Sequence, residues 1–216
     1  MLQFARREPS AILLAMQLLG VLLYPFMEDS EVGRALFSVF GIAILGLVVL
    51  AVRSMRGLTR VTLLLAAPAT VLLLIQAATR SDDLLPYSSG LEAMLYLYAA
   101  GALIAYMLAD HIITRDELWA VGATFTLVAW AFAYIYVVVQ AVEPGSFTAD
   151  SGTGERTWME LLYMSFTTLT SVGLSDIVPV KPFARSVVMI QELAGLGYVA
   201  VLVSRIIGLT VLRRSE

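Results

Sequence analysis

The chain has 216 residues, of which 59% are hydrophobic and 14% are charged, and its mean hydropathy is +0.84. A soluble domain of this length has too little interior to remove so much apolar surface from water, so the composition predicts an integral membrane protein. The net charge of -3 gives no indication of a nucleic-acid partner, and the absence of cysteine excludes a disulfide framework and a thiolate metal site.

Apolar stretches of about 20 residues between polar flanks predict six membrane-spanning helices. Their approximate ranges are 10–27, 35–52, 61–78, 91–109, 118–142 and 183–212. The first follows Arg6 and Arg7, as the apolar part of a signal peptide would. No small-residue cleavage site precedes the sequence MEDSEVGR, so we expect this helix to be retained.

The distribution of charge in the loops predicts the orientation, because arginine and lysine gather in short cytoplasmic loops. With both termini inside, the inner segments contain Arg6, Arg7, Arg53, Arg56, Arg60, Arg115, Arg213 and Arg214. The outer segments contain the acidic stretches MEDSE, SDD and EPGSFTADSGTGE. We therefore expect a multi-pass protein of the cell membrane, in contact with membrane lipids and with both termini cytoplasmic.

The first four predicted spans form a domain over residues 1–115. Its fourth span, LEAMLYLYAAGALIAYMLAD, contains no arginine, whereas a voltage sensor needs arginines at every third position there. We therefore expect no arginine-based voltage sensing. These helices could brace the rest of the protein, recognise lipid or bind a ligand, and the sequence identifies no small-molecule gating ligand.

A short amphipathic stretch, RTWMELLYMSFTTL, lies between the last two predicted spans. A helix that begins near Thr157, with Glu160 in its first turns, is too short to cross the membrane. Lipid permits such a helix only where protein or water satisfies its exposed backbone, so the stretch predicts a re-entrant pore helix.

The next residues, 171–174, would return outward in extended form. The carboxyl end of the pore helix carries partial negative charge, and the extended segment offers backbone carbonyls and the Ser171 hydroxyl in place of the water around a cation. One chain cannot surround an ion in this way, but four copies around an axis can. The expected assembly is a homotetramer with cyclic symmetry.

The sequence SFTTLTSVGLSDIVPVKPFARSVVMIQELAGLGYVAVLVSRIIGL resembles the pore module of the potassium-channel superfamily, and we assign residues 116–216 to this pore domain. In that family a pore helix leads into a filter of the form TVGYGD, then a proline-containing turn and an inner helix with a glycine hinge. Ser171 stands at the threonine, Val172 and Gly173 match, and Leu174 and Ser175 replace the tyrosine and the second glycine.

The resemblance implies roles for further residues. The ion-binding filter comprises Thr170, Ser171, Val172, Gly173, Leu174, Ser175 and Asp176, with potassium or sodium held by Ser171, Val172, Gly173 and Leu174. Thr167, Thr168 and Glu192 would support the filter, Gly195 and Gly197 would form the gating hinge, and Leu196, Val199, Val203 and Ile207 would line the cavity. Alternatives stay open: Glu192 could lie in water at the outer interface, the glycines could serve helix packing, and the apolar stripe could face lipid.

Two departures from the family pattern affect the outer end of the filter. The second filter glycine has a backbone conformation that costs an L-residue about 1 to 2 kcal/mol, so we expect Ser175 to be strained. Leu174 lacks the hydrogen-bonding hydroxyl of the tyrosine. We expect the inner ion sites at Ser171 and Val172 to survive and the outer end to be wider or differently folded.

The predicted fold is therefore an all-α membrane protein with six transmembrane helices, a re-entrant pore helix and an extended filter. Cyclic-nucleotide-gated relatives, which also lack the tyrosine and second glycine, discriminate little between sodium and potassium. The predicted function is passive conduction of potassium, with sodium as a second candidate ion. Alternatives are a potassium-selective channel, an ion transporter subunit and a non-conducting scaffold. We expect no enzymatic activity and no cofactor besides the permeant monovalent cations.

Overall fold

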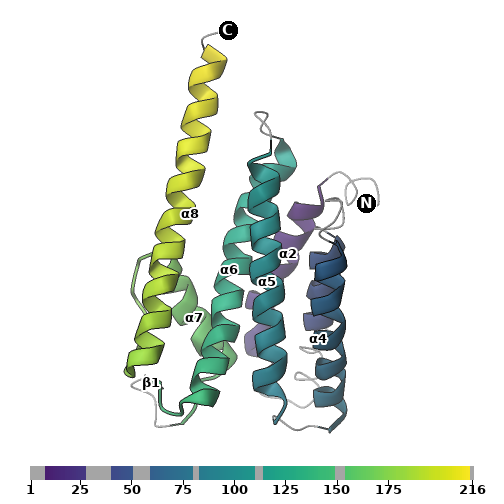
Figure 1. The fold of residues 1–216 in the computed structure, drawn as a ribbon, viewed down its shortest axis with the longest axis vertical. Helices are drawn as coiled ribbons and strands as arrows, with labels where there is room; N and C mark the ends of the chain where they lie inside the picture. The colour runs from purple at the N-terminus through teal and green to yellow at the C-terminus, as the bar shows by residue number, and fades with distance from the viewer. Residues whose placement is uncertain are drawn as a thin grey trace. The chain divides into compact units, whose positions relative to one another are not determined.

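A computed structural model describes residues 8–27, 40–50, 59–79, 83–109, 114–148 and 154–214. The described chain is helical, as predicted (Figure 1). Its helices are α2 (Pro9–Met27), an unlabelled apolar helix (Phe40–Leu50), α4 (Thr59–Thr79), α5 (Leu85–Met107), α6 (Arg115–Val142), α7 (Trp158–Leu169) and α8 (Pro182–Arg214). Two short strands, β1 (Phe147–Thr148) and β2 (Val178–Pro179), form an antiparallel pair.

Four of the described helices are long and apolar enough to cross a membrane. They are Pro9–Phe26, Leu85–Met107, Arg115–Val142 and Pro182–Arg205, which correspond to the first, fourth, fifth and sixth predicted spans. The second and third predicted spans coincide with the shorter apolar stretches Phe40–Leu50 and Arg60–Gln76, and residues 35–39 and 51–52 of the second lie outside the described residues. The count of six spans stays a prediction.

The chain divides into two compact units. The first comprises Met1–Ala109 and Ile113–Ala131, and the second consists mainly of Phe132–Glu216. The division falls inside α6, so this helix supplies its first half to one unit and its second half to the other. The predicted domain boundary between residues 115 and 116 stays a prediction.

In the first unit, polar contacts join the beginnings of α2 and α6. The backbone N–H and the hydroxyl of Ser10 both donate to the Asp116 carboxylate, each at 3.0 Å. Farther along, the ring of Trp130 on α6 meets Tyr96 of α5 edge-on, with 6.1 Å between the ring centroids. These contacts connect three helices of the unit.

Several polar side chains are buried inside this first unit. Gln17, Ser89 and Thr124 are each 0% exposed. Within the part of the chain that the structure describes, the side-chain oxygen and nitrogen atoms of these three residues make no hydrogen bond.

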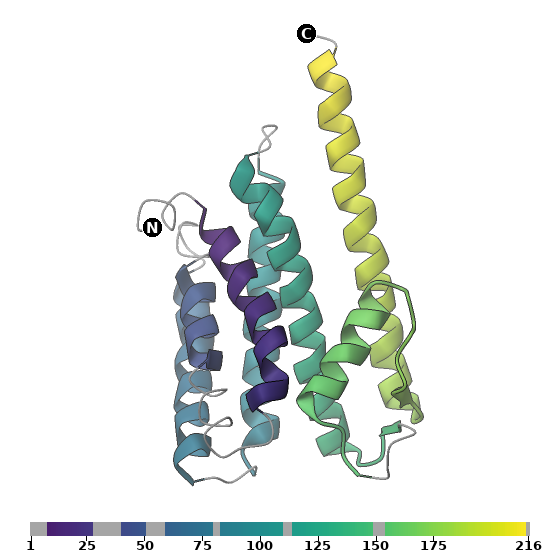
Figure 2. The ribbon, with the colours of Figure 1, turned by 180° about the vertical axis from the view of Figure 1, so that it is seen from behind.

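In the second unit, β1 and β2 connect the segment after α6 with the segment before α8 (Figure 2). Phe147 lies opposite Pro179 and Thr148 opposite Val178. Beside this pair, the Lys181 Nζ donates to the carbonyl of Pro144 at 2.7 Å. The pairing closes the loop that contains α7.

Candidate functional site

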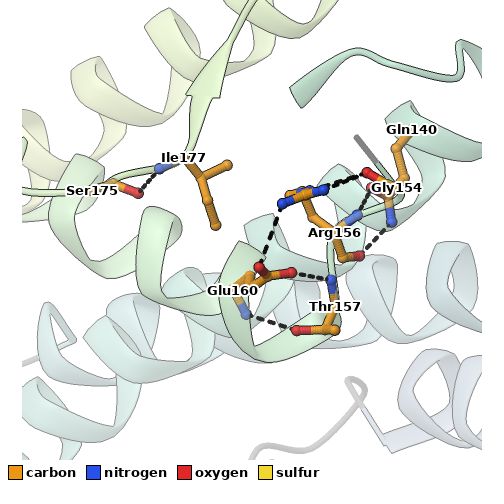
Figure 3. A network of polar contacts seen from close by, with 7 residues as sticks. All are labelled: Gln140, Gly154, Arg156, Thr157, Glu160, Ser175 and Ile177. Atoms are coloured by element: carbon orange, nitrogen blue, oxygen red, sulfur yellow. Dashed lines mark hydrogen bonds and ion pairs between the residues drawn. The ribbon is translucent and has the colours of Figure 1, made fainter. Parts of the chain in front are cut away.

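The short helix α7 begins where the sequence predicted, with Thr157 as its N-cap residue. The Thr157 hydroxyl accepts from the Glu160 N–H at 3.3 Å, and the Glu160 carboxylate accepts from the Thr157 N–H at 2.6 Å (Figure 3). This reciprocal pair satisfies backbone donors that a helix N-terminus leaves open, and it places negative charge at the positive end of the helix.

The residue before the cap is fixed to α6 through its backbone (Figure 3). The Gln140 Oε1 accepts from the Arg156 N–H at 3.0 Å, and the Gln140 Nε2 donates to the Arg156 carbonyl at 2.8 Å. The Arg156 side chain is 5% exposed, and its guanidinium lies 3.6 Å from the Glu160 carboxylate. These contacts set the position of the start of α7 against α6.

The far end of α7 closes with a Schellman motif, in which a left-handed residue ends the helix. The Ser171 N–H donates to the Thr168 carbonyl at 2.9 Å, and the Val172 N–H donates to the Thr167 carbonyl at 3.0 Å. Ser171 has φ 59° and Gly173 has φ 67°. The Gly173 N–H also donates to the Thr167 carbonyl, at 3.1 Å. Thr167 and Thr168 therefore support the following segment through their backbone oxygens.

The predicted strain at Ser175 is wrong. Among the described residues other than glycine, Ser171 alone has a positive φ. The reason is that the chain must leave the helix at Ser171, and the left-handed conformation makes that reversal. The Ser175 hydroxyl instead accepts a hydrogen bond from the Ile177 N–H at 3.0 Å (Figure 3).

These hydrogen bonds determine which way the filter carbonyls point. In a trans peptide, the C=O of one residue and the N–H of the next point in opposite directions, and the described chain has no cis peptide bond. Because the Val172 and Gly173 N–H groups point toward the Thr167 carbonyl on α7, the carbonyls of Ser171 and Val172 point away from that helix. The inner end of the predicted filter therefore directs two successive oxygens away from α7.

At the outer end the arrangement is reversed. The Tyr163 hydroxyl on α7 donates to the Leu174 carbonyl at 3.0 Å. This oxygen therefore points back toward α7. The contact was not predicted from the sequence, because nothing in the spacing of the two residues indicates that they meet.

A buried glutamine joins the helices behind the filter. Gln191 of α8 is 0% exposed, and its Nε2 donates to the Ser165 carbonyl at 3.0 Å and to the Ser165 hydroxyl at 2.6 Å. Its Oε1 accepts from the Tyr136 hydroxyl on α6. One side chain thus connects α6, α7 and α8. No role for Gln191 was predicted from the sequence, although a polar amide within an apolar helix indicates a buried hydrogen-bonding position.

Comparison with known proteins places this arrangement in a family. The family model described as ion channel matches residues 122–211. Protein LctB of Geobacillus stearothermophilus is 35% identical over 101 residues, which cover 45% of this chain and 75% of that protein. The chain belongs to this ion-channel family.

A second relative supports the assignment. Protein LctB of Bacillus caldotenax is 30% identical over 101 residues, again 45% of this chain and 75% of that protein. No solved structure matches the chain. Family membership and the four candidate spans together make the channel an integral membrane protein.

The side chains of the predicted filter are largely exposed in the single chain. Val172 is 57% exposed and Leu174 is 72% exposed, and Asp176 is also exposed. The Thr170 hydroxyl turns back to α7, where it donates to the carbonyls of Phe166 at 2.8 Å and Thr167 at 3.2 Å. The ion-binding roles of these residues stay predictions.

The resemblance implied that Glu192 supports the filter together with Thr167 and Thr168. The Thr167 hydroxyl instead donates to the Met164 carbonyl at 2.9 Å, and Thr170 bonds backbone carbonyls as well. Glu192 is exposed in the single chain, and its neighbour Gln191 occupies the buried position beside α7. The filter-supporting role of Glu192 stays a prediction.

The helix α8 is continuous across the two candidate hinge glycines. Gly195 is buried, and a Cβ there would overlap the Leu169 backbone carbonyl at the end of α7. No atom among the described residues lies within 4 Å of the corresponding position at Gly197. Gly195 therefore permits close contact between α8 and α7, and the hinge role of both stays a prediction.

The residues expected to line the cavity follow along α8. Leu196, Val199 and Val203 are 65%, 48% and 48% exposed in the single chain. The Ile207 side chain lies outside the described residues. Their role also stays a prediction.

Proposed function

We propose that four copies of the chain form a cation channel that conducts potassium and other monovalent cations, including sodium, passively across the membrane. The observation that carries this proposal is the direction of the Ser171 and Val172 carbonyls, which point away from α7 because the following N–H groups bond the Thr167 carbonyl behind them. Two successive oxygens directed away from a supporting helix are suitable ligands for a dehydrated cation.

The position of these carbonyls relative to α7 adds electrostatic stabilisation. They lie at the carboxyl end of the helix, where the macrodipole carries about half a negative charge. In the proposed channel this end faces the membrane interior, so a cation there interacts with the helix end of each subunit. The same arrangement disfavours anions.

The proposal of a tetramer rests on the surfaces that a single chain leaves uncovered. Of the apolar stretch of α8 that is long enough to span a membrane, only 11% is buried in the single chain. The corresponding share for α6 is 67%. In the proposed assembly, neighbouring subunits cover much of α8, and the stripe with Leu196, Val199 and Val203 faces the axis. In a tetramer, the filter segments of four subunits surround the axis, so that carbonyl oxygens coordinate each ion from all sides.

Weak discrimination between potassium and sodium is part of the proposal, because only the inner end of the filter directs its oxygens away from α7. A potassium-selective channel is the main alternative, and a transporter subunit or a non-conducting scaffold are lesser ones. In the proposed orientation both termini are cytoplasmic, and β1, β2 and the entrance of the filter face outward.

Ion flux into liposomes containing the purified full chain tests the proposed function. We expect rapid uptake of both potassium and sodium, and cross-linking or native mass measurement should give a tetramer. Gly173→Ala should greatly reduce flux, because Gly173 has φ 67°, which an alanine resists. Gly101→Ala, on α5 in open space, is the matched control and should conduct normally. Slow saturable exchange would favour a transporter, and the absence of flux in the wild type would contradict the proposal.

A further inference from the structure

The outer end of the filter differs from the inner end in the orientation of one peptide group. The Tyr163 hydroxyl donates to the Leu174 carbonyl at 3.0 Å, across 11 residues of sequence. That oxygen points back toward α7, whereas the Ser171 and Val172 carbonyls point away from it. By the geometry of the trans peptide, the Ser175 N–H then points away from α7.

We propose that Tyr163 determines ion specificity at the outer end of the filter, by holding the peptide between Leu174 and Ser175 with its oxygen turned away from the ion path. This inference rests on the proposed function. An ion at the level of Leu174 meets an N–H group from each subunit in place of a carbonyl oxygen, so it keeps part of its hydration shell.

The consequence for selectivity follows from how such filters discriminate. Potassium and sodium are distinguished where carbonyl oxygens replace hydration water. A level at which the ion stays hydrated contributes little discrimination. Loss of the Leu174 oxygen therefore shortens the discriminating part of the filter from its outer end, and the channel passes sodium more readily.

The neighbouring contacts stabilise the same orientation. The Ser175 hydroxyl accepts from the Ile177 N–H at 3.0 Å, so this side chain is also engaged within its own subunit. The Leu174 side chain is 72% exposed, and leucine offers no hydrogen bond that could compete with Tyr163. Within the described chain, the Tyr163 hydroxyl is thus the group that fixes this carbonyl.

The hydrogen bond between Tyr163 and Leu174 is strong enough to change ion selectivity but too weak to determine folding. A neutral hydrogen bond contributes about 1 kcal/mol net, which corresponds to a factor of about five in an equilibrium. The Tyr163 side chain is 48% exposed in the single chain, so removal of its hydroxyl leaves no deeply buried cavity.

Tyr163→Phe tests the inference, because it removes the hydroxyl and keeps the ring. In planar bilayers with potassium on one side and sodium on the other, we expect the permeability ratio of potassium to sodium to rise about three- to tenfold. A density map in thallium should show an ion at the level of Leu174 that the wild type lacks. Tyr87→Phe, at an exposed tyrosine of α5, is the matched control and should leave the ratio unchanged.

The outcomes separate the inference from the function on which it rests. A correctly assembled Tyr163→Phe channel with an unchanged or lower potassium preference overturns the role of Tyr163, while the wild-type current still supports the proposed function. A loss of conduction in Tyr163→Phe alone, with normal assembly and melting temperature, also overturns it. If the wild type passes no ions, the proposed function fails and the inference fails with it.

Discussion

Buried glutamines in the two compact units differ in their hydrogen-bond partners. In the second unit, Gln140 bonds the backbone of Arg156 just before α7, and Gln191 bonds Ser165 within α7. In the first unit, Gln17 is equally buried but makes no side-chain hydrogen bond within the described residues. Satisfied polar networks specify one arrangement of the helices around them.

The difference suggests a division of labour between the units. In the second unit, the proposed filter requires carbonyl oxygens in fixed orientations, and directional bonds from α6 and α8 position α7 beside it. In the first unit, Ser10 bonds Asp116 and Gln76 bonds Ser88, but the buried side chains of Gln17 and Thr124 make no hydrogen bond within the described residues. Substitutions of buried glutamines and threonines in the two units can break or sharpen this comparison.

The largest effect is expected for Gln191→Leu. The change removes the bonds to Ser165 and Tyr136 and leaves their polar groups buried without this partner. We expect the free energy of unfolding to fall by about 2 to 4 kcal/mol, together with reduced conduction. Titration of the purified protein with a denaturing detergent, followed by tryptophan fluorescence, measures the first effect. A change below about 0.5 kcal/mol would show that the network does not stabilise the second unit.

Gln140→Leu should have the next largest effect. It removes the two hydrogen bonds between the Gln140 side chain and the backbone of Arg156, a buried residue just before α7. We expect a loss of about 2 to 3 kcal/mol and increased hydrogen exchange at the beginning of α7. Gln140→Glu keeps the acceptor for the Arg156 N–H but turns a carboxylate oxygen toward the Arg156 carbonyl, so it should not restore the loss. Unchanged stability and unchanged exchange in Gln140→Leu would contradict the assignment of the bonds.

Gln17→Leu is the matched test in the first unit, and its effect should be smaller and opposite in sign. The leucine replaces a buried amide that has no hydrogen bond in the described structure. We expect stability to be unchanged or to rise by up to about 1 kcal/mol. A loss as large as that of Gln191→Leu in the same detergent titration would remove the distinction between the units.

Thr124→Val should have the smallest effect. The substitution keeps the shape of the side chain and removes a buried hydroxyl without a described hydrogen bond. We expect stabilisation of about 0.5 kcal/mol. The corresponding change in α7, Thr167→Val, removes the bond to Met164 and should destabilise the protein slightly. The same sign for both variants would argue against the comparison.

Helices and their ends were largely predictable from the sequence. Hydropathy and length located the four long spans. The polar and apolar pattern after Thr157, with Glu160 in the first turns, located α7 to within one residue. The position and the start of a helix depend on residues that are close together in the sequence, so they can be predicted from it.

The orientations of individual groups in the site could not be predicted in the same way. The left-handed residue was expected at Ser175, by analogy with a family glycine, but it is Ser171. Gln191, and not the charged Glu192, bonds α7. Both depend on where α7 ends and on which face of α8 meets it, and these are properties of packing between segments distant in sequence.

The left-handed conformation of Ser171 places two requirements on a single position. The backbone must accept a positive φ, which β-branched side chains resist, while the proposed ion path favours a hydroxyl group. Threonine meets only the second requirement, valine neither and glycine only the first, so serine is among the few residues that suit both. Evolution of selectivity in this channel is therefore limited at residue 171 by the stereochemistry of the chain as much as by the ion.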